Sequence, residues 1–174
     1  GDIAIPLEYE YAYDFKEGLA PVKKNGQYGY VDPIGETVIP FQYDWVSSFS
    51  EGLARTGSRG SYNYIDKTGQ IALEVNYDYV FDFIDGRAIV FNRDQYAVID
   101  RTGSFIIPFG RWGFIFGFHD GLSMVHGDSG YEGNHTYIHT NGDIAIGGVP
   151  FYDATDFSEG LAAVATHTKS TNKV

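Results

Sequence analysis

The chain has 174 residues, the length of one ordinary domain, and its 23 acidic and 12 basic side chains give a formal net charge of −11. This charge opposes binding to nucleic acid and to anionic lipid through long-range repulsion. Because there is no cysteine, disulfides and thiol chemistry are excluded. No apolar run approaches the length of a membrane span and no signal peptide opens the sequence, so we expect neither membrane insertion nor an export address in these residues.

The opening residues 1–14 predict part of a repeat, because the sequence from Gly1 to Pro6 matches that from Gly35 to Pro40. Gly1 also stands as far before Phe15 as Gly35 stands before Phe49. We therefore expect the chain to begin within a repeat. The segment 157–174 matches only the first strand of a repeat, so we expect a segment of a longer array, or two partial ends that complete each other in a ring.

An anchor motif of the form Phe-x-acid-Gly, first seen at Phe15-Lys16-Glu17-Gly18, organises the chain. Its phenylalanines are 34, 34, 35 and 39 residues apart, and they are Phe15, Phe49, Phe83, Phe118 and Phe157. A period of this size indicates a repeat protein. A glycine that follows an acidic residue in every copy indicates a turn with positive φ rather than a binding loop. The acidic residues would form a line along the array, too widely spaced to converge on one calcium ion.

A second marker confirms the period and predicts tight type I turns between strands. Its copies are Asp32-Pro33-Ile34-Gly35, Asp66-Lys67-Thr68-Gly69, Asp100-Arg101-Thr102-Gly103 and His139-Thr140-Asn141-Gly142. Short β-branched and aromatic runs flank each copy, as in strands. The anchor leads into a further strand, 19–24, and Asn25-Gly26 predicts a two-residue hairpin after it.

These elements predict an all-β fold, an array of three-stranded antiparallel meanders that is solenoid-like or, alternatively, a closed propeller-like ring. The aromatic linker after each third strand, such as 41–46, fits either a fourth short strand or one helical turn. Helical repeats of similar period are excluded, because Tyr-x-Tyr alternation has the period of a strand. We place full repeats at 15–48, 49–82, 83–117 and 118–156, with partial repeats at 1–14 and 157–174, in one repeat domain.

The motifs Phe-x-Glu-Gly-Leu-Ala-x-Val, Asn-Gly-x-Tyr-Gly-Tyr-Val-Asp-x-x-Gly, Val-Ile-Pro and Tyr-Asp resemble the bacterial WG repeat, also called the KWG repeat. Residues 15–48 carry nearly the whole pattern. The Trp-Gly signature departs from the family: it reads Tyr28-Gly29, Tyr62-Asn63, Tyr96-Ala97 and His135-Thr136. The resemblance implies an all-β repeat module of bacterial proteins that is not known as a catalytic fold.

The paired tyrosines are the first candidates for a ligand surface, because residues two apart share one face of a strand. Cross-strand packing into an aromatic ladder is sufficient to explain them and is the favoured interpretation; the alternative is an exposed platform for sugar rings or peptide. The candidate ligand residues are Tyr28, Tyr30, Tyr62, Tyr64, Tyr96, Tyr131 and His135.

The fourth repeat contains an expansion from His126 to His135, which includes Tyr131. We expect a solvated loop, since insertions in repeat arrays map to loops, and loops often carry recognition. His135 and His139 share a strand face but lie about 13 Å apart, too far for one metal ion. We therefore predict no metal site.

The sequence contains no motif of a nucleophilic, phosphate-binding, zinc-dependent or dinucleotide-binding enzyme. We expect no catalytic residues and no cofactor. The expected function is that of a scaffold or protein-binding module, with another protein as partner. The alternative is carbohydrate or cell-envelope binding through exposed tyrosines, with a glycan as ligand. Compartment and oligomeric state stay open.

Overall fold

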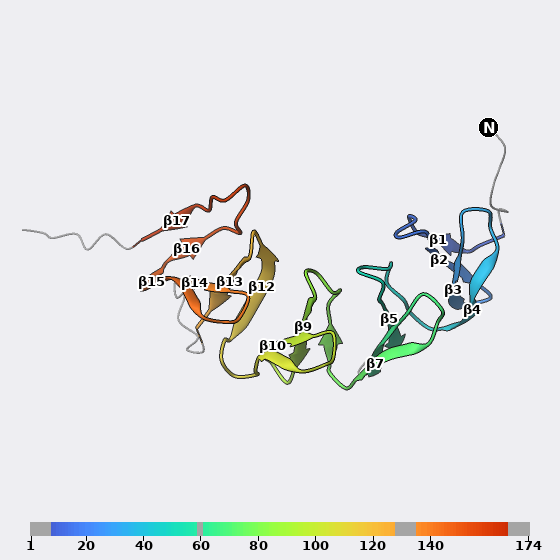
Figure 1. Ribbon diagram of the computed structural model, residues 1–174, viewed down its shortest axis with the longest axis horizontal. Helices are drawn as coiled ribbons and strands as arrows, with labels where there is room; N and C mark the ends of the chain where they lie inside the picture. Colours follow the sequence, from blue (N-terminus) through green and yellow to red (C-terminus); the bar gives the residue numbers. More distant parts are fainter. Residues whose placement is uncertain (1–7, 59–60, 128–134, 167–174) are drawn as a thin grey trace, which may run out of the picture. The chain divides into compact units, whose positions relative to one another are not determined.

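The computed structural model describes residues 8–58, 61–127 and 135–166, and every regular element in this part of the chain is a β-strand. The all-β prediction is therefore confirmed (Figure 1). Within these ranges no helix is long and apolar enough to span a membrane. The chain divides into two compact units, Gly1–Arg93 with Ile99–Ser104, and Asp94–Val98 with Phe105–Val174, each of which is described by itself.

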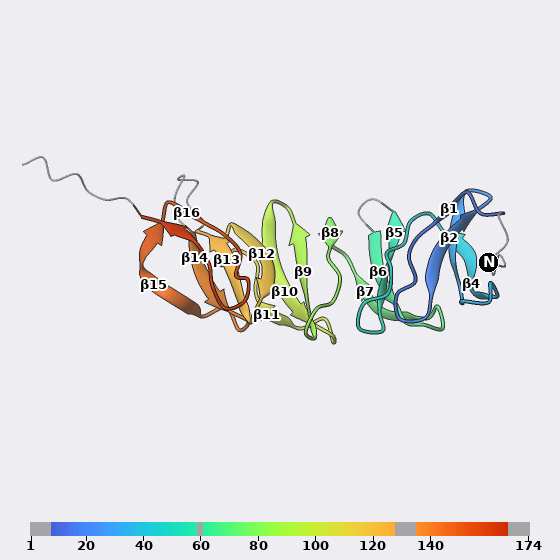
Figure 2. The same cartoon turned by 90° about the horizontal axis from the view of Figure 1, so that it is seen from above.

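The strands pair into small antiparallel sheets, none of which closes into a barrel (Figure 2). The first sheet, in the order β1-β2-β3-β4, consists of Tyr11–Ala12, Ala20–Lys24, Gln27–Val31 and Thr37–Tyr43. The second, β5-β6-β7, consists of Ala54–Ser58, Ser61–Ile65 and Ile71–Val75. The third, β11-β10-β9-β8, consists of Phe105–Ile107, Gln95–Asp100, Arg87–Asn92 and Tyr79–Val80.

Two further sheets follow in the second unit. The fourth sheet, β12-β13-β14-β15, consists of Phe114–His119, Leu122–His126, His135–His139 and Ile144–Phe151. The last, β16-β17, consists of Asp153–Ala154 and Val164–Ala165. Each of these sheets is a meander of strands consecutive in sequence, as predicted.

The aromatic linkers, which the sequence left open, form short strands and not helical turns. The linker strand pairs with the first strand of the repeat that follows it, as β1 does with β2 and β8 with β9. In the second sheet the same place is taken by a single bridge from Val46 to Thr56. Except in the second sheet, each three-stranded meander thus gains one outer strand from the preceding linker.

Both predicted kinds of turn are present. In the anchor, Glu17 and Gly18 have φ angles of 51° and 86°, and Lys16 bridges to Leu19, so the motif is a two-residue turn of the I′ type. At the second marker the Asp66 carboxylate accepts hydrogen bonds from the amides of Thr68 and Gln70, at 2.8 and 3.1 Å. Each motif recurs along the chain because every repeat needs the turn that the motif forms.

A close backbone approach explains why the signature glycine is kept only in part. A Cβ atom on Gly29 would lie 2.6 Å from the carbonyl oxygen of Ile39, where the register of β3 and β4 shifts between Tyr28 and Tyr30. At the equivalent place in the second sheet, Asn63 pairs in regular register with Glu74. A side chain fits there because the bulge is absent.

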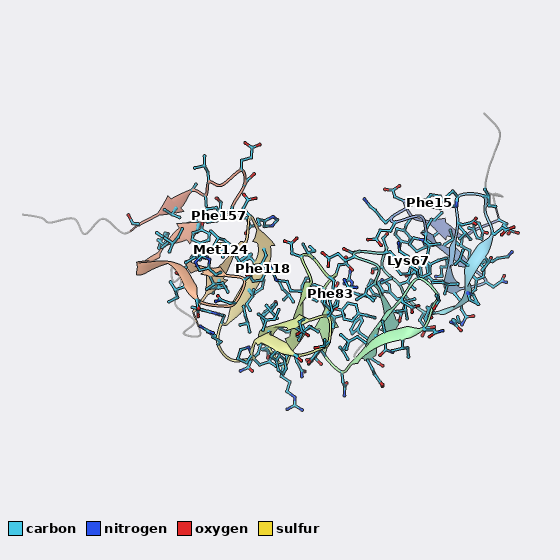
Figure 3. All side chains as sticks on the ribbon, viewed as in Figure 1. Phe15, Lys67, Phe83, Phe118, Met124 and Phe157 are labelled. Atoms are coloured by element: carbon cyan, nitrogen blue, oxygen red, sulfur yellow. The ribbon has the colours of Figure 1, made fainter. Side chains whose placement is uncertain are left out.

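The anchor phenylalanine packs between repeats on the second tyrosine of the preceding Tyr-x-Tyr pair. Phe49 lies on Tyr30 with ring centroids 4.9 Å apart, and Phe83 lies on Tyr64 at 4.8 Å. Both phenylalanines are almost completely buried, whereas Phe15 is 40% exposed. Figure 3 labels Phe15 and Phe83. One hydrophobic core cluster of the first unit contains both Tyr30 and Phe49.

The acidic residue of the anchor connects one repeat to the next, first at Glu17. The Glu17 carboxylate accepts a hydrogen bond from the Gly52 amide at 2.9 Å and pairs with Lys67 Nζ at 3.1 Å. Lys67 also donates to the Glu17 carbonyl at 3.0 Å. Burial alone would raise the pKa of Glu17, but the hydrogen bonds from Lys67 and Gly52 lower it overall.

The same fastening recurs one repeat further on. The Glu51 carboxylate accepts a hydrogen bond from the Gly86 amide at 2.9 Å, and Arg101 donates to the Glu51 carbonyl at 2.9 Å. The cations come from one position of the Asp-x-Thr-Gly turn. The line of acidic residues therefore has a structural role in holding neighbouring repeats together.

Candidate functional site

The structure divides the candidate tyrosines by their depth in the sheets. The second tyrosine of each pair lies in the core: Tyr30 and Tyr64 are 0% and 1% exposed. Their hydroxyls donate to the carbonyls of Ser47 and Phe81, at 2.7 and 2.6 Å. Burial is the leading reason that the pKa values of both phenols are raised. A buried ring offers no face to a ligand.

The first residue of each pair lies nearer the hairpin end of its strand, and there it joins an aromatic cluster. Tyr28, Tyr62, Tyr96 and His135 occupy this position. Tyr62 is itself 9% exposed, but it contacts more exposed rings. Tyr131 lies outside the described residues. Alternation along a strand predicted the shared face correctly but carried no information about depth.

The N-terminal aromatic cluster consists of Tyr11, Tyr13, Lys23 and Tyr28. Lys23 is opposite Tyr11 on β1 and Tyr28 on β3, and its Nζ lies 5.8 and 5.3 Å from the two ring centroids. Tyr11 and Tyr13 are 63% and 52% exposed. The Tyr13 hydroxyl, followed by burial, raises the pKa of Tyr28.

The central aromatic cluster consists of Trp45, Arg55, Tyr62, Tyr79 and Phe81. Its four rings form a continuous series, with centroid distances of 6.2 Å from Trp45 to Tyr62, 5.7 Å from Tyr62 to Tyr79 and 5.0 Å from Tyr79 to Phe81. Tyr79 and Phe81 are 38% and 41% exposed. The cluster presents a wide aromatic surface next to a cation.

Arg55 is fixed within this cluster. Its Nε donates to Asp82 at 2.6 Å and its Nη1 donates to the Val80 carbonyl at 2.7 Å. Its guanidinium carbon lies 5.1 Å from the Trp45 ring centroid and 5.8 Å from that of Tyr79. Burial alone would lower the pKa of Arg55, but attraction to Asp82 raises it overall, so the cation is retained.

The C-terminal aromatic cluster consists of Tyr96, Phe114, Phe116, His126 and His135. The Tyr96 and Phe114 ring centroids lie 4.5 Å apart, and those of His126 and His135, directly opposite on β13 and β14, lie 4.0 Å apart. Burial, and then repulsion from His135, lowers the pKa of His126. His135 thus faces His126 and not His139.

The described residues hold no group of three or more His, Cys, Asp or Glu side chains that could bind a metal ion. In the second unit, the Asp120 carboxylate accepts a hydrogen bond from the Gly160 amide at 2.8 Å. The anchor acids with described contacts therefore point at backbone amides.

Sequence reasoning missed Trp45, Arg55, Tyr79 and Phe81. Three of them lie in linkers whose sequence fits either a short strand or one helical turn. Arg55 belongs to no repeated motif, because an arginine occurs at this position in one repeat only. A usable signal was present: Arg55 stands where the other repeats have Pro21, Ile89 and Met124. When the repeats are aligned, each set of equivalent residues forms a column. A single cation in an otherwise uncharged column indicates a feature specific to one repeat.

Together, the repeated antiparallel sheets, anchor turns and inter-repeat contacts define an all-β repeat protein. The sequence matches the model of the WG containing repeat in five stretches, residues 1–28, 28–57, 64–96, 96–125 and 136–166. The chain belongs to this family. No curated protein matches the sequence.

Among solved structures, Kluyveromyces lactis Hsv2 is similar in fold, with a TM-score of 0.52, 11% identity, and coverage of 89% of this chain and 57% of Hsv2. A Kluyveromyces lactis Hsv2 with its loop 6CD replaced by a Gly-Ser linker gives a TM-score of 0.53, 13% identity, and coverage of 82% and 54%. The chain spans about half the length of these Hsv2 structures. Hsv2 is a β-propeller, a likeness consistent with an array and with a ring.

Proposed function

We propose that this repeat module is a non-enzymatic interaction module that binds another protein through the central aromatic cluster. The observation that carries the proposal is the joining of Trp45, Arg55 and Tyr79 in one partly exposed cluster. Trp, Tyr and Arg are the residue types most enriched among the energetically dominant residues of protein interfaces.

The rigidity of the cluster supports this proposal. Arg55 is held by Asp82 and the Val80 carbonyl, and the rings brace one another, so little side-chain entropy is lost on binding. Because the side chains are already ordered before binding, less of the favourable interaction free energy is offset by lost entropy, and the affinity is higher.

The charge of the molecule indicates the chemistry of the partner. The chain carries a net charge of −11, and Asp44 and Asp78 are exposed in the segments that flank the cluster. Charge complementarity favours a protein that presents apolar residues beside basic ones, and it accelerates their association at low salt.

The test is site-specific photo-crosslinking from position 81 in the native chain, followed by affinity measurement with the captured protein after its purification. We expect Tyr79→Ala and Phe81→Ala each to weaken binding at least tenfold, as for dominant interface residues. Phe105→Ala is the matched control, since Phe105 is an aromatic residue that is 51% exposed outside the cluster.

Two outcomes contradict the proposal. One is equal loss of affinity in Phe105→Ala and Phe81→Ala, because the cluster would then have no special role. The other is a glycan array in which binding is found and is lost in Tyr79→Ala, because the cluster would then be a carbohydrate surface. Thermal melts of each variant separate loss of binding from loss of fold.

A further inference from the structure

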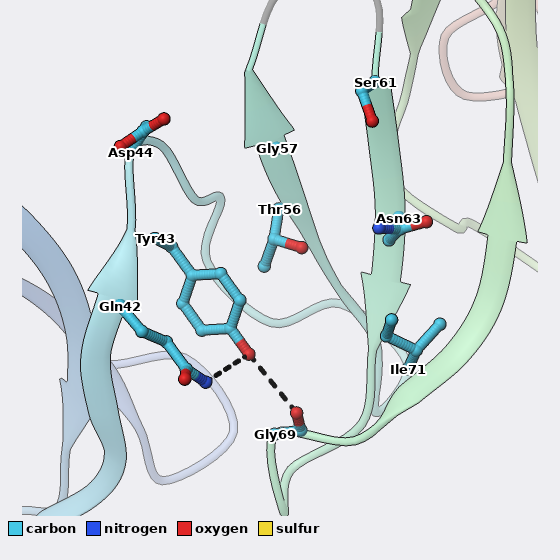
Figure 4. A pocket seen from close by; sticks show the side chains of 9 residues that line it. All are labelled: Gln42, Tyr43, Asp44, Thr56, Gly57, Ser61, Asn63, Gly69 and Ile71. Carbon is cyan, nitrogen blue, oxygen red and sulfur yellow. Dashed lines mark hydrogen bonds between the residues drawn. The ribbon is translucent and has the colours of Figure 1, made fainter.

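We propose that the groove between β4 and the second sheet binds a neutral saccharide. The groove has a volume of about 440 Å³, within the range of small-ligand pockets. It lies entirely in the first unit, and Figure 4 shows the side chains around it. Its lining residues are Gln42, Tyr43, Asp44, Thr56, Gly57, Ser61, Asn63, Gly69 and Ile71.

Several of the residues that line this groove are specific to the second repeat. Thr56 occupies a column in which the other repeats have Val22, Val90 and Val125. Thr56 is only 3% exposed, so a polar group has replaced an apolar one at a buried position. Because Thr56 lines the groove, its hydroxyl can donate or accept a hydrogen bond there.

Gly57, beside Thr56, is also specific to the second repeat. The other repeats have the larger residues Lys23, Phe91 and His126 at this position. Gly57 has a φ of +148°, and a Cβ atom there would lie 2.1 Å from the Ser61 carbonyl oxygen, so no other residue fits this backbone. The glycine therefore allows the close approach of β5 and β6 that brings Ser61 to the groove.

Asn63 supplies an amide from the central strand. The equivalent residues are Gly29, Ala97 and Thr136, so the second repeat alone has a carboxamide here. Within the described residues, no hydrogen bond is formed by the side chains of Asn63, Thr56 or Asp44. These groups are available to a ligand.

Tyr43 forms the opposite wall and is already oriented. Its hydroxyl donates to the Gly69 carbonyl at 3.2 Å and accepts from Gln42 Nε2 at 3.1 Å, as the dashed lines in Figure 4 show. The hydroxyl is therefore satisfied, whereas the Gln42 carbonyl oxygen keeps its accepting capacity. The Tyr43 ring and Ile71 add apolar surface to the groove.

This lining selects the ligand class. Amides and hydroxyls provide both donors and acceptors, one carboxylate accepts, and none of the described lining residues is a cation. Anionic ligands are disfavoured by Asp44 and by the net charge of −11. A sugar combines hydroxyls around its rim with apolar C–H faces, which matches polar groups that face an aromatic ring.

The experiment is an NMR titration of the chain with glucose, maltose, cellobiose and N,N′-diacetylchitobiose at up to about 10 mM, a range that detects millimolar affinity. Glucose 6-phosphate is the anionic control. We expect at least one neutral sugar to shift the amide signals of Thr56, Gly57 and Asn63, and to bind more tightly than glucose 6-phosphate.

Two variants return the groove to residues used in the other repeats, so they should keep the fold: Thr56→Val and Asn63→Ala. Each is expected to weaken sugar binding at least tenfold. Asn76→Ala is the matched control, because Asn76 is the exposed equivalent of Gln42 in the next repeat, and it should bind as the native chain does. The proposal is overturned if no neutral sugar shifts these signals, or if Thr56→Val binds as tightly as the native chain.

Discussion

Two contacts between repeats can be compared: the one between the first and second full repeats, and the one after the fourth repeat. Both contain the same ring pair and the same carboxylate-to-amide hydrogen bond, but their residues differ in burial. In the first, the Tyr30 and Phe49 ring centroids lie 4.9 Å apart, and in the last, those of Tyr137 and Phe157 lie 4.8 Å apart. Yet Leu53, which follows the first contact, is 7% exposed, whereas its counterpart Leu161 is 76% exposed.

The difference separates two causes of stability. The ring pair and the carboxylate-to-amide hydrogen bond are present in both contacts, since Glu17 accepts from the Gly52 amide and Asp120 accepts from the Gly160 amide. Burial does not follow from the motif alone, because Phe49 belongs to a hydrophobic core cluster of the first unit whereas Phe157 is only partly buried. The anchor motif thus determines the geometry of the contact between two repeats. The packing around that contact determines most of its contribution to the free energy of unfolding.

The largest expected effect comes from removing the buried ring. Phe49→Ala should lower the free energy of unfolding by about 3–5 kcal/mol, as for a core aromatic residue. Phe157→Ala should cost about 1–2 kcal/mol, because this ring is only partly buried. Urea denaturation measures both. A cost below about 1 kcal/mol for Phe49→Ala would show that its ring is not an anchor of the core.

Loss of the phenol hydroxyl should have a smaller effect. Tyr30→Phe should cost about 1–2 kcal/mol, because the acceptor belongs to Ser47, which is 8% exposed, and would be left without its donor. Tyr137→Phe should cost less, since Thr155 is exposed and water can replace the donor. Equal costs at the two sites, measured by denaturation, would contradict the role of burial.

The pH dependence of the first contact should come partly from Glu17. Its pKa is lowered in the folded chain, so the carboxylate adds stability above its ordinary pKa of 4.5, and this stability is lost as the pH falls through the folded pKa. Glu17→Gln should therefore flatten the acid side of the stability profile. Glu36→Gln, at an exposed position, is the control. An unchanged slope in Glu17→Gln would refute this role.

The smallest effect should come from Lys67, the cation that pairs with Glu17 in the first contact. Lys67→Met should cost about 0.2–1 kcal/mol, because the pair with Glu17 is partly exposed. The difference between Lys67→Met and the native chain should shrink in high salt, which screens exposed charges. Melting at low and high salt measures it, and a difference independent of salt would mean that packing of the side chain matters instead.

Much of the fold could be predicted from sequence, because turn chemistry is local. Glycine and aspartate at fixed offsets predicted the anchor turn and the Asp66 turn, and Asn25-Gly26 predicted the first hairpin. The linker strands could not be predicted, because two residues such as Tyr79–Val80 become a strand only through pairing with the next repeat.

The candidate sites were harder to predict, since exposure depends on tertiary packing. Tyr28 and Tyr30 share one strand face, yet only Tyr28 lies in a surface cluster, because the next repeat covers Tyr30 through Phe49. Thr56 gave a local signal, a polar residue in a column of valines, that a comparison of repeats column by column would have found.

The anchor turn has a consequence for how such chains can change in length. The second copy offers a carboxylate to the following repeat, through Glu51 and Gly86, and its own glycine amide to the preceding one, through Gly52 and Glu17. Duplication of a segment from one anchor to the next would therefore create a new contact with both halves already matched. Repeat number can vary by duplication or deletion without compensating substitutions at the junction.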